Sequence, residues 1–353
     1  MNTHDNFPGI PPFPNDVPTA PLFRLSLSKL QAHDEAEVTR LMQACRDIGF
    51  FYLNLQDSDA GISILKDTDD LFQTGKSLFD LSLSEKQKYD FSSQNSYSGY
   101  KAQGAALADR QGNRDRNEFY NASKDDILNL TPPLPSPPLL QTALPTLTSF
   151  TQTAHSITTL LLTLLAKTLH LPLSTLTDLH RLHFRSGDQV RFIKAPPQPS
   201  QDRRTAMGAH TDFGSITILF NRLGGLQVLP PGADAEWVYV RPLPGHAIVN
   251  LGDAMVKFTN GLLRSNIHRI VAPPGEQADW TRYSLAYFAR PEDEVVLRQV
   301  EGSDLIPELD GEEEDVRSKE WVLRRAFGTR GRLDDVDLKS YIGTEMMSRR
   351  IGV

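Results

Sequence analysis

The stretch from about Leu182 to Pro291 breaks into many short apolar runs, and this pattern limits the possible folds more than any other feature of the sequence. The runs are rich in Val, Ile, Phe and Tyr and are separated by Gly, Pro, Asn and Asp, as are antiparallel strands joined by turns. Many short strands at close spacing are typical of a closed or double-sheet all-β domain. The runs are VRFIKA, SITILF, LQVLP, WVYVRPL, HAIVNLG, HRIVAPP and YSLAYFARP.

Helices are expected on the N-terminal side of this β region. Residues 34–48 place apolar side chains at helical spacing behind an acidic first turn, and the strand FFYLNL follows. A second helix is expected over about Ile62 to Phe79, and a third after Pro145. The third includes the apolar run Ile157 to Leu173, which is too short to cross a bilayer and indicates a buried helix.

Shorter signals predict further elements near the N-terminus, before the β region and near the C-terminus. The alternation in Pro21 to Leu30 predicts a short strand, and Ser82 and Glu85 have the spacing of a capping box. The acidic residues 307–317 predict an exposed loop, and residues 318–327 and 338–350 predict terminal helices. We therefore expect a mainly β fold with flanking helices, divided into segments 1–20 (an extended N-terminal arm), 21–145 (an α/β region), 146–300 (the β core) and 301–353 (the acidic loop and helices).

Composition excludes several classes of protein. The 353 residues carry a formal net charge of −7 and no Lys/Arg-rich run, which argues against nucleic-acid binding. Cys45 is the one cysteine, so no internal disulfide is possible, and the N-terminus lacks the basic and apolar regions of a signal peptide. A cytoplasmic protein that binds neither nucleic acid nor membranes is expected, and nothing in the sequence indicates its oligomeric state.

A histidine and an aspartate lie two residues apart in the run GAHTDFGSITILF. On a strand, His210 and Asp212 would point to the same face, where burying them is costly unless something binds them. Two histidines and a carboxylate on one face form the usual site of non-haem Fe(II) oxygenases, and His268 is the candidate third ligand, 56 positions after Asp212. By itself the His-x-Asp pair also arises by chance, and a buried histidine is more often a hydrogen-bonded core residue.

Downstream, Arg282 and Ser284 repeat the same spacing on a predicted strand. An arginine offers a planar pair of donors to a carboxylate, and the serine hydroxyl can donate to the same group. A buried arginine needs an anion, which is either a bound ligand or an internal Asp or Glu.

Taken together in this order, the motifs resemble those of the isopenicillin-N-synthase-like family of Fe(II)- and 2-oxoglutarate-dependent dioxygenases. The resemblance covers roughly residues 20–300. Its C-terminal pattern SKEWVLRRAF is similar to that of fungal members. The motifs that carry it are LMQACRDIGFFYL, LSLSEKQKYDF, HTDFGSITILF, GLQVLP, VNLGDAMVKFTNGLLRSNIHRIV and RYSLAYFARP.

The resemblance implies a double-stranded β-helix, or jelly roll, with helices packed outside. It implies that His210, Asp212 and His268 bind Fe(II), and that Arg282 and Ser284 bind the far carboxylate of 2-oxoglutarate. With O2, such an enzyme converts 2-oxoglutarate to succinate and CO2 and oxidises an unactivated C–H bond of a small organic molecule. Because Asp212 is present, hydroxylation, desaturation or ring formation is expected rather than halogenation, in secondary metabolism.

The sequence departs from the family at one position. Where many members have a tyrosine that contacts the cosubstrate, VRFIKAPP has Ala195, although Arg191 keeps the expected basic position. Lys194 is adjacent to Ala195, but alternation along a strand points it to the opposite face. The residues expected to line the substrate pocket are Arg191, Phe192, Lys194, Phe220 and Phe288.

Two other functions stay open from the sequence. An Fe(II) oxidase on the same fold, independent of the cosubstrate, would keep the same motifs, and succinate formation would distinguish it. A non-catalytic binding protein would be indicated by loss of a metal ligand, and no ligand position is lost here.

Overall fold

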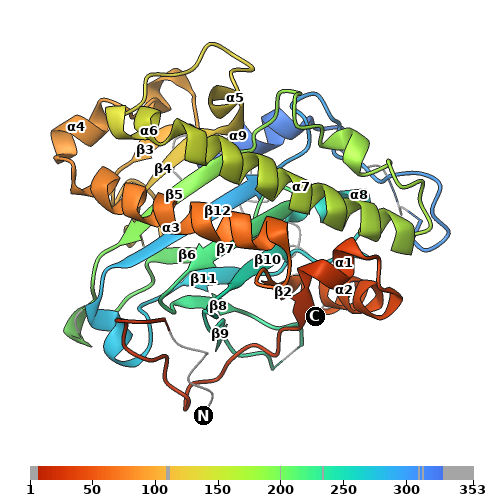
Figure 1. Ribbon diagram of the computed structural model, residues 1–353, viewed down its shortest axis with the longest axis horizontal. Coiled ribbons are helices and arrows are strands. Elements are labelled where there is room, and N and C mark those ends of the chain that lie inside the picture. The colour runs from red at the N-terminus through yellow and green to blue at the C-terminus, as the bar shows by residue number, and fades with distance from the viewer. Residues whose placement is uncertain are drawn as a thin grey trace.

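Two β-sheets, covered on one side by long helices, make up the body of the protein (Figure 1). The computed structural model describes residues 7–108, 112–198, 200–232, 234–308, 311 and 314–328. Within these residues one sheet has eight strands and the other has four. The larger sheet has the order β1 (Arg24–Ser26), β2 (Phe50–Asn54), β10 (His246–Leu251), β7 (Ile216–Asn221), β12 (Arg282–Ala289), β5 (Gln189–Ala195), β4 (Glu118–Ser123) and β3 (Gly99–Lys101). The smaller sheet has the order β6 (Met207–His210), β11 (His268–Ile270), β8 (Leu226–Val228) and β9 (Val238–Tyr239).

The helices precede, interrupt and follow the strands. Figure 1 shows α3 and α7 crossing the same face of the larger sheet. The α-helices are α1 (Leu27–Gln31), α2 (Glu35–Asp47), α3 (Asp59–Asp80), α4 (Leu83–Gln87), α5 (Lys124–Ile127), α6 (Pro138–Thr142), α7 (Leu144–Thr168), α8 (Asp253–Phe258) and α9 (Ser318–Gly328). Short 3₁₀ turns occur at Ser92–Gln94, Thr177–Leu179, Ser200–Asp202 and Gly275–Asp279.

Most of the expected elements are present, and their ends follow local capping. The side chain of Ser82 accepts a hydrogen bond from the Glu85 amide at the start of α4, as the capping box predicts. The expected strand over residues 21–30 is wrong in its second half. Ser26 ends β1 and accepts from the Lys29 amide, so it caps α1 and the chain turns helical. The predicted terminal helix 318–327 is present as α9, and the one over 338–350 lies outside the described residues.

The long helices define the outer face of the larger sheet. Gly75 of α3 lies against the ring of Phe192, and Phe150 of α7 contacts Phe220 edge to face, with ring centroids 5.8 Å apart. Because side chains alternate along a strand, the neighbours of Phe192 and Phe220 point to the other face, which we call the inner face. On β12, Leu285 and Tyr287 belong to the core under the helices, so alternation directs Arg282, Ser284, Ala286 and Phe288 to the inner face.

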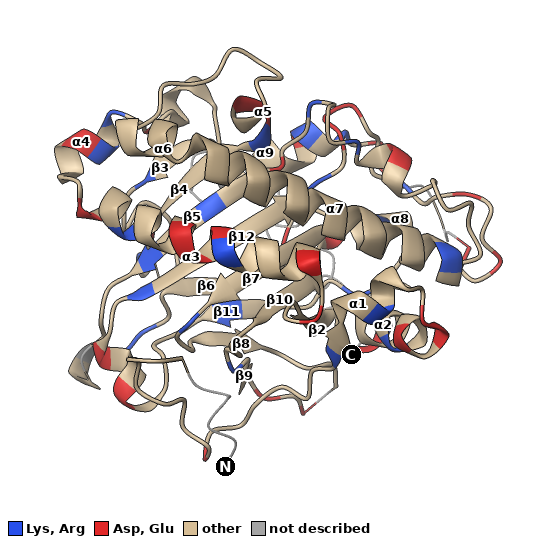
Figure 2. Cartoon of the chain, viewed as in Figure 1, with Lys and Arg blue, Asp and Glu red and all other residues tan. Residues whose placement is uncertain are grey.

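The surface carries charges of both signs. Figure 2 shows lysine and arginine interspersed with aspartate and glutamate over the helices and loops of this view. The N-terminal arm runs along the smaller sheet, where Thr19 forms a parallel bridge with Tyr239. Of the helices that the structure describes, none has the length and apolar character that crossing a membrane requires.

Candidate functional site

Two histidines and an aspartate converge between the sheets. His210 ends β6 and His268 begins β11, and the two are directly opposite each other in the smaller sheet, with ring centroids 4.3 Å apart. Asp212 follows β6 by two residues, and its Oδ1 lies 3.8 Å from Nε2 of His268. One potential ligand atom from each of the three residues lies within 4.8 Å of the others. The structure thus brings together three residues that are 58 positions apart at most in the sequence.

Each of these side chains has two polar atoms, and a hydrogen bond to one of them fixes its orientation. The Nδ1 atoms of His210 and His268 lie 2.8 and 3.1 Å from the backbone oxygens of Gly208 and Asn266. This fixes each ring and leaves Nε2 for a metal ion. Asp212 accepts hydrogen bonds at Oδ2 from the Thr217 hydroxyl, at 2.6 Å, and from the Asn250 amide, at 2.7 Å. Its Oδ1 therefore remains for the metal.

Burial sets the protonation of this cluster. It lowers the pKa of His210 to about 3, with a further contribution from the nearby His268. Burial alone would raise the pKa of Asp212. The nearby His268 and His210, together with the hydrogen bonds from Asn250 and Thr217, outweigh this, so the carboxyl has a pKa below its usual range. Neutral imidazole and ionised carboxylate are the forms that bind metals, and two nitrogens with one oxygen suit Fe(II). The residues present fit the expected iron.

Arg282 and Ser284 form a second part of the site, on the inner face of β12. Arg282 is 3% exposed, and it donates from Nε to the Gly224 oxygen at 2.7 Å and from Nη1 to the Ser284 hydroxyl at 2.6 Å. Its Nη2 is buried without a hydrogen-bond partner, and among the described residues no carboxylate pairs with it. Burial lowers its pKa to about 10. A buried guanidinium with a spare donor fits a carboxylate ligand such as the far end of 2-oxoglutarate.

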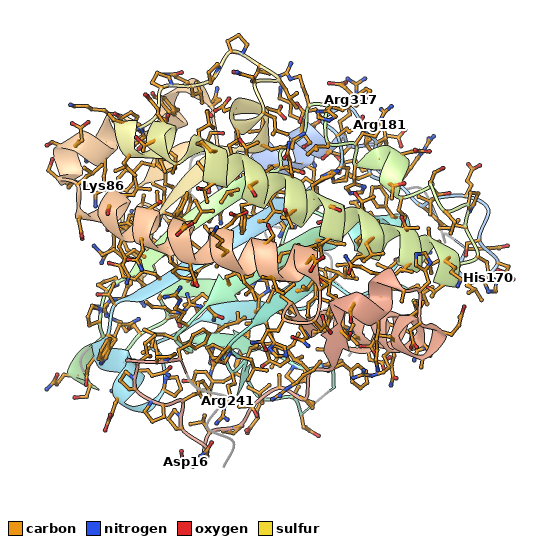
Figure 3. The ribbon with its side chains drawn as sticks, viewed as in Figure 1. Asp16, Lys86, His170, Arg181, Arg241 and Arg317 are labelled. Atoms are coloured by element: carbon orange, nitrogen blue, oxygen red, sulfur yellow. The ribbon has the colours of Figure 1, made fainter. Side chains whose placement is uncertain are left out.

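The absent tyrosine leaves a small residue beside this arginine. Ala195 is buried and lies directly across from Arg282 in the register of β5 and β12. Lys194 points to the other face, where its Nζ lies 3.6 Å from Oε1 of Glu118. Glu118 also binds Lys86, which Figure 3 labels beside α4. Lys194 therefore faces away from Arg282, as alternation predicts.

The structure does not support three of the five residues expected to line the substrate pocket. Phe192 and Phe220 pack against α3 and α7, and Lys194 shares their outer face. We therefore correct the expectation for these three residues. The physical reason is that strands buried on both faces carry apolar side chains on each, so an aromatic residue does not by itself mark the inner face.

The other two residues do meet on the inner face. The guanidinium carbon of Arg191 lies 4.7 Å from the ring centroid of Phe288. Sequence reasoning missed two of the residues around them, Asn121 and Arg290. The signal for Arg290 was available, because RYSLAYFARP places it two positions after Phe288 on the same alternating face.

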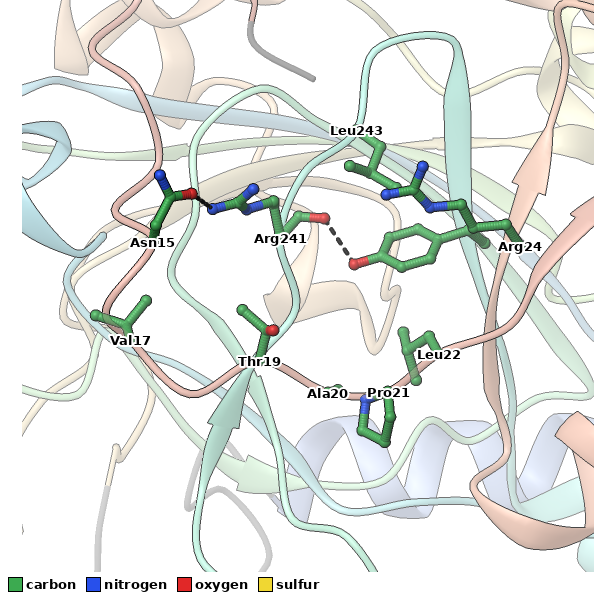
Figure 4. Close-up of a pocket in the computed structure, with 10 residues that line it drawn as sticks. Asn15, Val17, Thr19, Ala20, Pro21, Leu22, Arg24, Arg241 and Leu243 are labelled. Atoms are coloured by element: carbon green, nitrogen blue, oxygen red, sulfur yellow. Dashed lines mark hydrogen bonds between the residues drawn. The ribbon is translucent and has the colours of Figure 1, made fainter. Parts of the chain in front are cut away.

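A separate pocket opens near the N-terminal arm (Figure 4). It has a volume of about 350 Å³, and Arg241 at its wall donates to the side-chain oxygen of Asn15. None of the predicted metal-binding or cosubstrate-binding residues lines it. Figure 3 places Arg241 near Asp16, on the N-terminal side of the molecule.

Comparison with known proteins agrees with this geometry. The sequence pattern of the 2OG-Fe(II) oxygenase superfamily matches residues 186–291, and that of the N-terminal region of non-haem dioxygenases in morphine synthesis matches residues 20–137. A 2-oxoglutarate-dependent dioxygenase of Aspergillus fumigatus is 35% identical over 339 residues, covering 88% of this chain and 85% of that protein. Another, from Glarea lozoyensis, is 31% identical over 283 residues, covering 80% and 83%.

Solved structures share the fold at lower identity. A putative 2OG-Fe(II) oxygenase family protein from Caulobacter crescentus superposes with a TM-score of 0.71 at 23% identity, covering 88% of this chain and 99% of that one. A Neurospora crassa protein, in complex with alpha-KG and thymine, superposes with a TM-score of 0.69 at 21% identity, covering 87% and 97%. The two facing sheets are thus the jelly roll that the sequence predicts.

Proposed function

Because the chain belongs to the 2OG-Fe(II) oxygenase superfamily, we propose that His210, Asp212 and His268 hold its Fe(II) and that Arg282 and Ser284 hold its 2-oxoglutarate. The chain is an oxidoreductase, a 2-oxoglutarate-dependent dioxygenase that uses Fe(II), 2-oxoglutarate and O2. We propose further that it oxidises an unactivated C–H bond of a small organic molecule in secondary metabolism. The similarity to fungal 2-oxoglutarate-dependent dioxygenases supports this proposal.

One observation carries the assignment of the residues. Each of His210, Asp212 and His268 uses one polar atom within the protein and directs its other toward the same point, within 4.8 Å. A structural cluster would use up both atoms, because buried polar groups are almost always paired. The spare buried donor of Arg282 repeats this pattern for an anion.

Bound Fe(II) supplies the redox chemistry that couples decarboxylation of 2-oxoglutarate to oxidation of the substrate. The protein supplies geometry. Thr217 and Asn250 hold the Asp212 carboxylate in one orientation, and Gly224 and Ser284 hold the guanidinium of Arg282. Both sites lie between the sheets, where the low dielectric strengthens charge interactions with the cosubstrate.

Succinate formation tests this proposal. Purified protein supplied with Fe(II), 2-oxoglutarate and O2 should form succinate, and His210→Ala should abolish this without unfolding the chain. Lys194→Met, which removes a charge from the outer face of the same sheet, is the matched control and should keep the activity. Oxidation of a substrate without 2-oxoglutarate and without succinate would instead support the Fe(II) oxidase.

A further inference from the structure

A pair of buried arginines, Arg191 and Arg290, lies on the inner face, apart from Arg282. Arg290 follows β12 and is 3% exposed, and Arg191 on β5 is 7% exposed. Both guanidinium groups face the ring of Phe288, at 5.5 Å for Arg290 and 4.7 Å for Arg191. Both also face Tyr97, at 5.9 and 5.3 Å. The two cations therefore share one aromatic-lined space.

Neutral groups supply the hydrogen bonds of Arg191. It donates from Nε to the side-chain oxygen of Asn121 at 2.7 Å and from Nη2 to the Tyr97 hydroxyl at 2.5 Å. Its guanidinium carbon also lies 4.3 Å from the ring centroid of Phe119. Its Nη1 has no hydrogen-bond partner among the residues that the structure describes.

The guanidinium of Arg290 makes fewer hydrogen bonds than that of Arg191. Its Nη1 donates to the backbone oxygen of Gly187, and its Nε is buried with no partner. Two carboxylates lie nearby, and both are engaged elsewhere. Asp188 accepts from the Tyr287 hydroxyl and from the backbone amide of Arg290, each at 2.7 Å, and Asp212 accepts from Thr217 and Asn250. Neither Arg191 nor Arg290 forms an ion pair with a carboxylate in the described part of the chain. The two buried guanidinium groups repel each other, and neither has a carboxylate of a described residue within ion-pair distance, so a bound anion would relieve this cost.

This arginine pair adjoins the metal cluster at the end remote from the cosubstrate. Phe288 lies directly across from Thr217, whose hydroxyl binds Asp212, and Arg290 packs on Gly214, two residues after Asp212. Arg290 lies eight residues from Arg282 along the same stretch, roughly 26 Å in an extended strand. Arg191 lies across from Ala286, four residues from Arg282. One five-carbon dicarboxylate therefore cannot bind Arg282 and Arg290 together.

We propose that Arg191 and Arg290 bind a carboxylate of the organic substrate, whose apolar part packs on Phe288, Phe119 and Tyr97. The inference rests on the proposed function, because it names the substrate class of that same site. A carboxylate suits the pair because arginine presents two parallel donors to it, and the aromatic rings give the site affinity for an apolar body. The substrate is thus an organic acid that carries an apolar group.

Paired acids and amides test this proposal by binding alone. Phenylacetate, 3-phenylpropanoate and octanoate, each beside its primary amide, are titrated calorimetrically into the full chain loaded with Mn(II) and 2-oxoglutarate. At least one acid should bind ten-fold or more tightly than its amide. Arg191→Met and Arg290→Met should bring that ratio close to one, whereas Lys194→Met, on the outer face of β5, should preserve it. Arg191→Lys and Arg290→Lys, which keep the charge, should retain part of the preference.

Three results would overturn the proposal. The first is that no acid in the panel binds more tightly than its amide to the wild-type protein, a comparison that needs no variant to fold. The second is an acid preference that survives in both methionine variants. The third is a preference lost only in Arg282→Met, which would assign the anion to the cosubstrate site. Succinate formation, measured separately on the Fe(II) protein, reports on the proposed function, so either idea can fail while the other stands.

Discussion

Arg325 and Arg282 are almost equally buried, and only one of them has a counter-ion. Arg325 on α9 is 1% exposed and donates from Nη1 to Asp253 at 2.6 Å, and Asp253 is itself fully buried. Arg282 is 3% exposed and has no carboxylate partner among the described residues. We infer that this difference separates a structural arginine from one that binds a ligand. Folding alone supplies a counter-ion for Arg325, whereas Arg282 is left to pair with an incoming anion.

The contacts of Arg325 explain what its ion pair stabilises. Its Nη2 lies 3.2 Å from the Thr211 hydroxyl, and Thr211 in turn donates to Asp253 at 3.0 Å. On the same helix, Trp321 donates from its ring nitrogen to the Phe213 oxygen at 3.1 Å. Helix α9 therefore holds the residues on both sides of Asp212, although it lies far from that residue in the sequence.

Replacing Arg325 should give the largest loss of stability. Arg325→Met leaves the buried charge of Asp253 without its arginine, which costs about 3–5 kcal/mol in the free energy of unfolding. Urea titration measures it. Arg324→Met is the matched control on the same helix. Its pairs with Glu314 and Glu320 are partly exposed, so the loss should be about 0–1 kcal/mol. Equal losses in the two variants would contradict the structural role of Arg325.

Replacing Arg282 should weaken ligand binding and leave the stability of the protein almost unchanged. Arg282→Met should weaken 2-oxoglutarate binding by about 2–5 kcal/mol, because the far carboxylate loses its paired donor. Unfolding of the ligand-free protein should change little, since no internal carboxylate loses a partner. Calorimetric titration of 2-oxoglutarate into the Mn(II) protein measures the affinity. A large loss of stability with unchanged affinity would make Arg282 structural, like Arg325.

The residues that orient Asp212 should have a smaller effect. Asn250→Ala removes a donor to Oδ2 and should weaken metal binding about 10- to 100-fold, as loss of a residue that orients a ligand typically does. Thr217→Val should act similarly, and Thr217→Ser should restore binding because it keeps the hydroxyl. Competition with a fluorescent chelator reports the affinity. An equal loss in the serine and valine variants would show that packing, not the hydrogen bond, matters.

Replacing Lys194 should have the smallest effect on stability and on 2-oxoglutarate affinity. Its contact with Glu118 spans 3.6 Å and is partly exposed, so Lys194→Met should cost about 0–1 kcal/mol of stability. Because Lys194 faces away from Arg282, the affinity for 2-oxoglutarate should change by no more than about two-fold. A ten-fold change would correspond to about 1.4 kcal/mol of binding free energy. A ten-fold loss would mean that the lysine replaces the absent tyrosine after all.

The strands and the proposed metal-binding residues could be predicted because their signals are local or follow a recognisable order. Gly, Pro, Asn and Asp mark the ends of the β region, and His210 and Asp212 share a face by simple alternation. Spacing alone could not place His268 across from His210, because five elements of chain separate them and pairing in the smaller sheet is set by tertiary contacts. The family motifs supplied that residue.

The substrate side could not be predicted in the same way. Phe192 and Phe220 lie on strands buried on both faces, and the sequence does not tell which face α3 and α7 cover. The polar residues Arg191 and Ser284 were the better guide, since alternation along paired strands places both on the same face as Arg282. Continuing their alternation to Arg290 would have revealed the pair formed by Arg191 and Arg290. The role of α9 rests on contacts between distant segments, which no local pattern shows.

Metal stoichiometry tests the central claim most directly. Anaerobic equilibrium dialysis with Fe(II) should give one tightly bound ion per wild-type chain and none in His268→Ala, while the far-ultraviolet circular dichroism of the two proteins stays the same. The reason is that His268 contributes one of the three converging donor atoms but little of the core. Full retention of one Fe(II) per chain by folded His268→Ala would contradict the account.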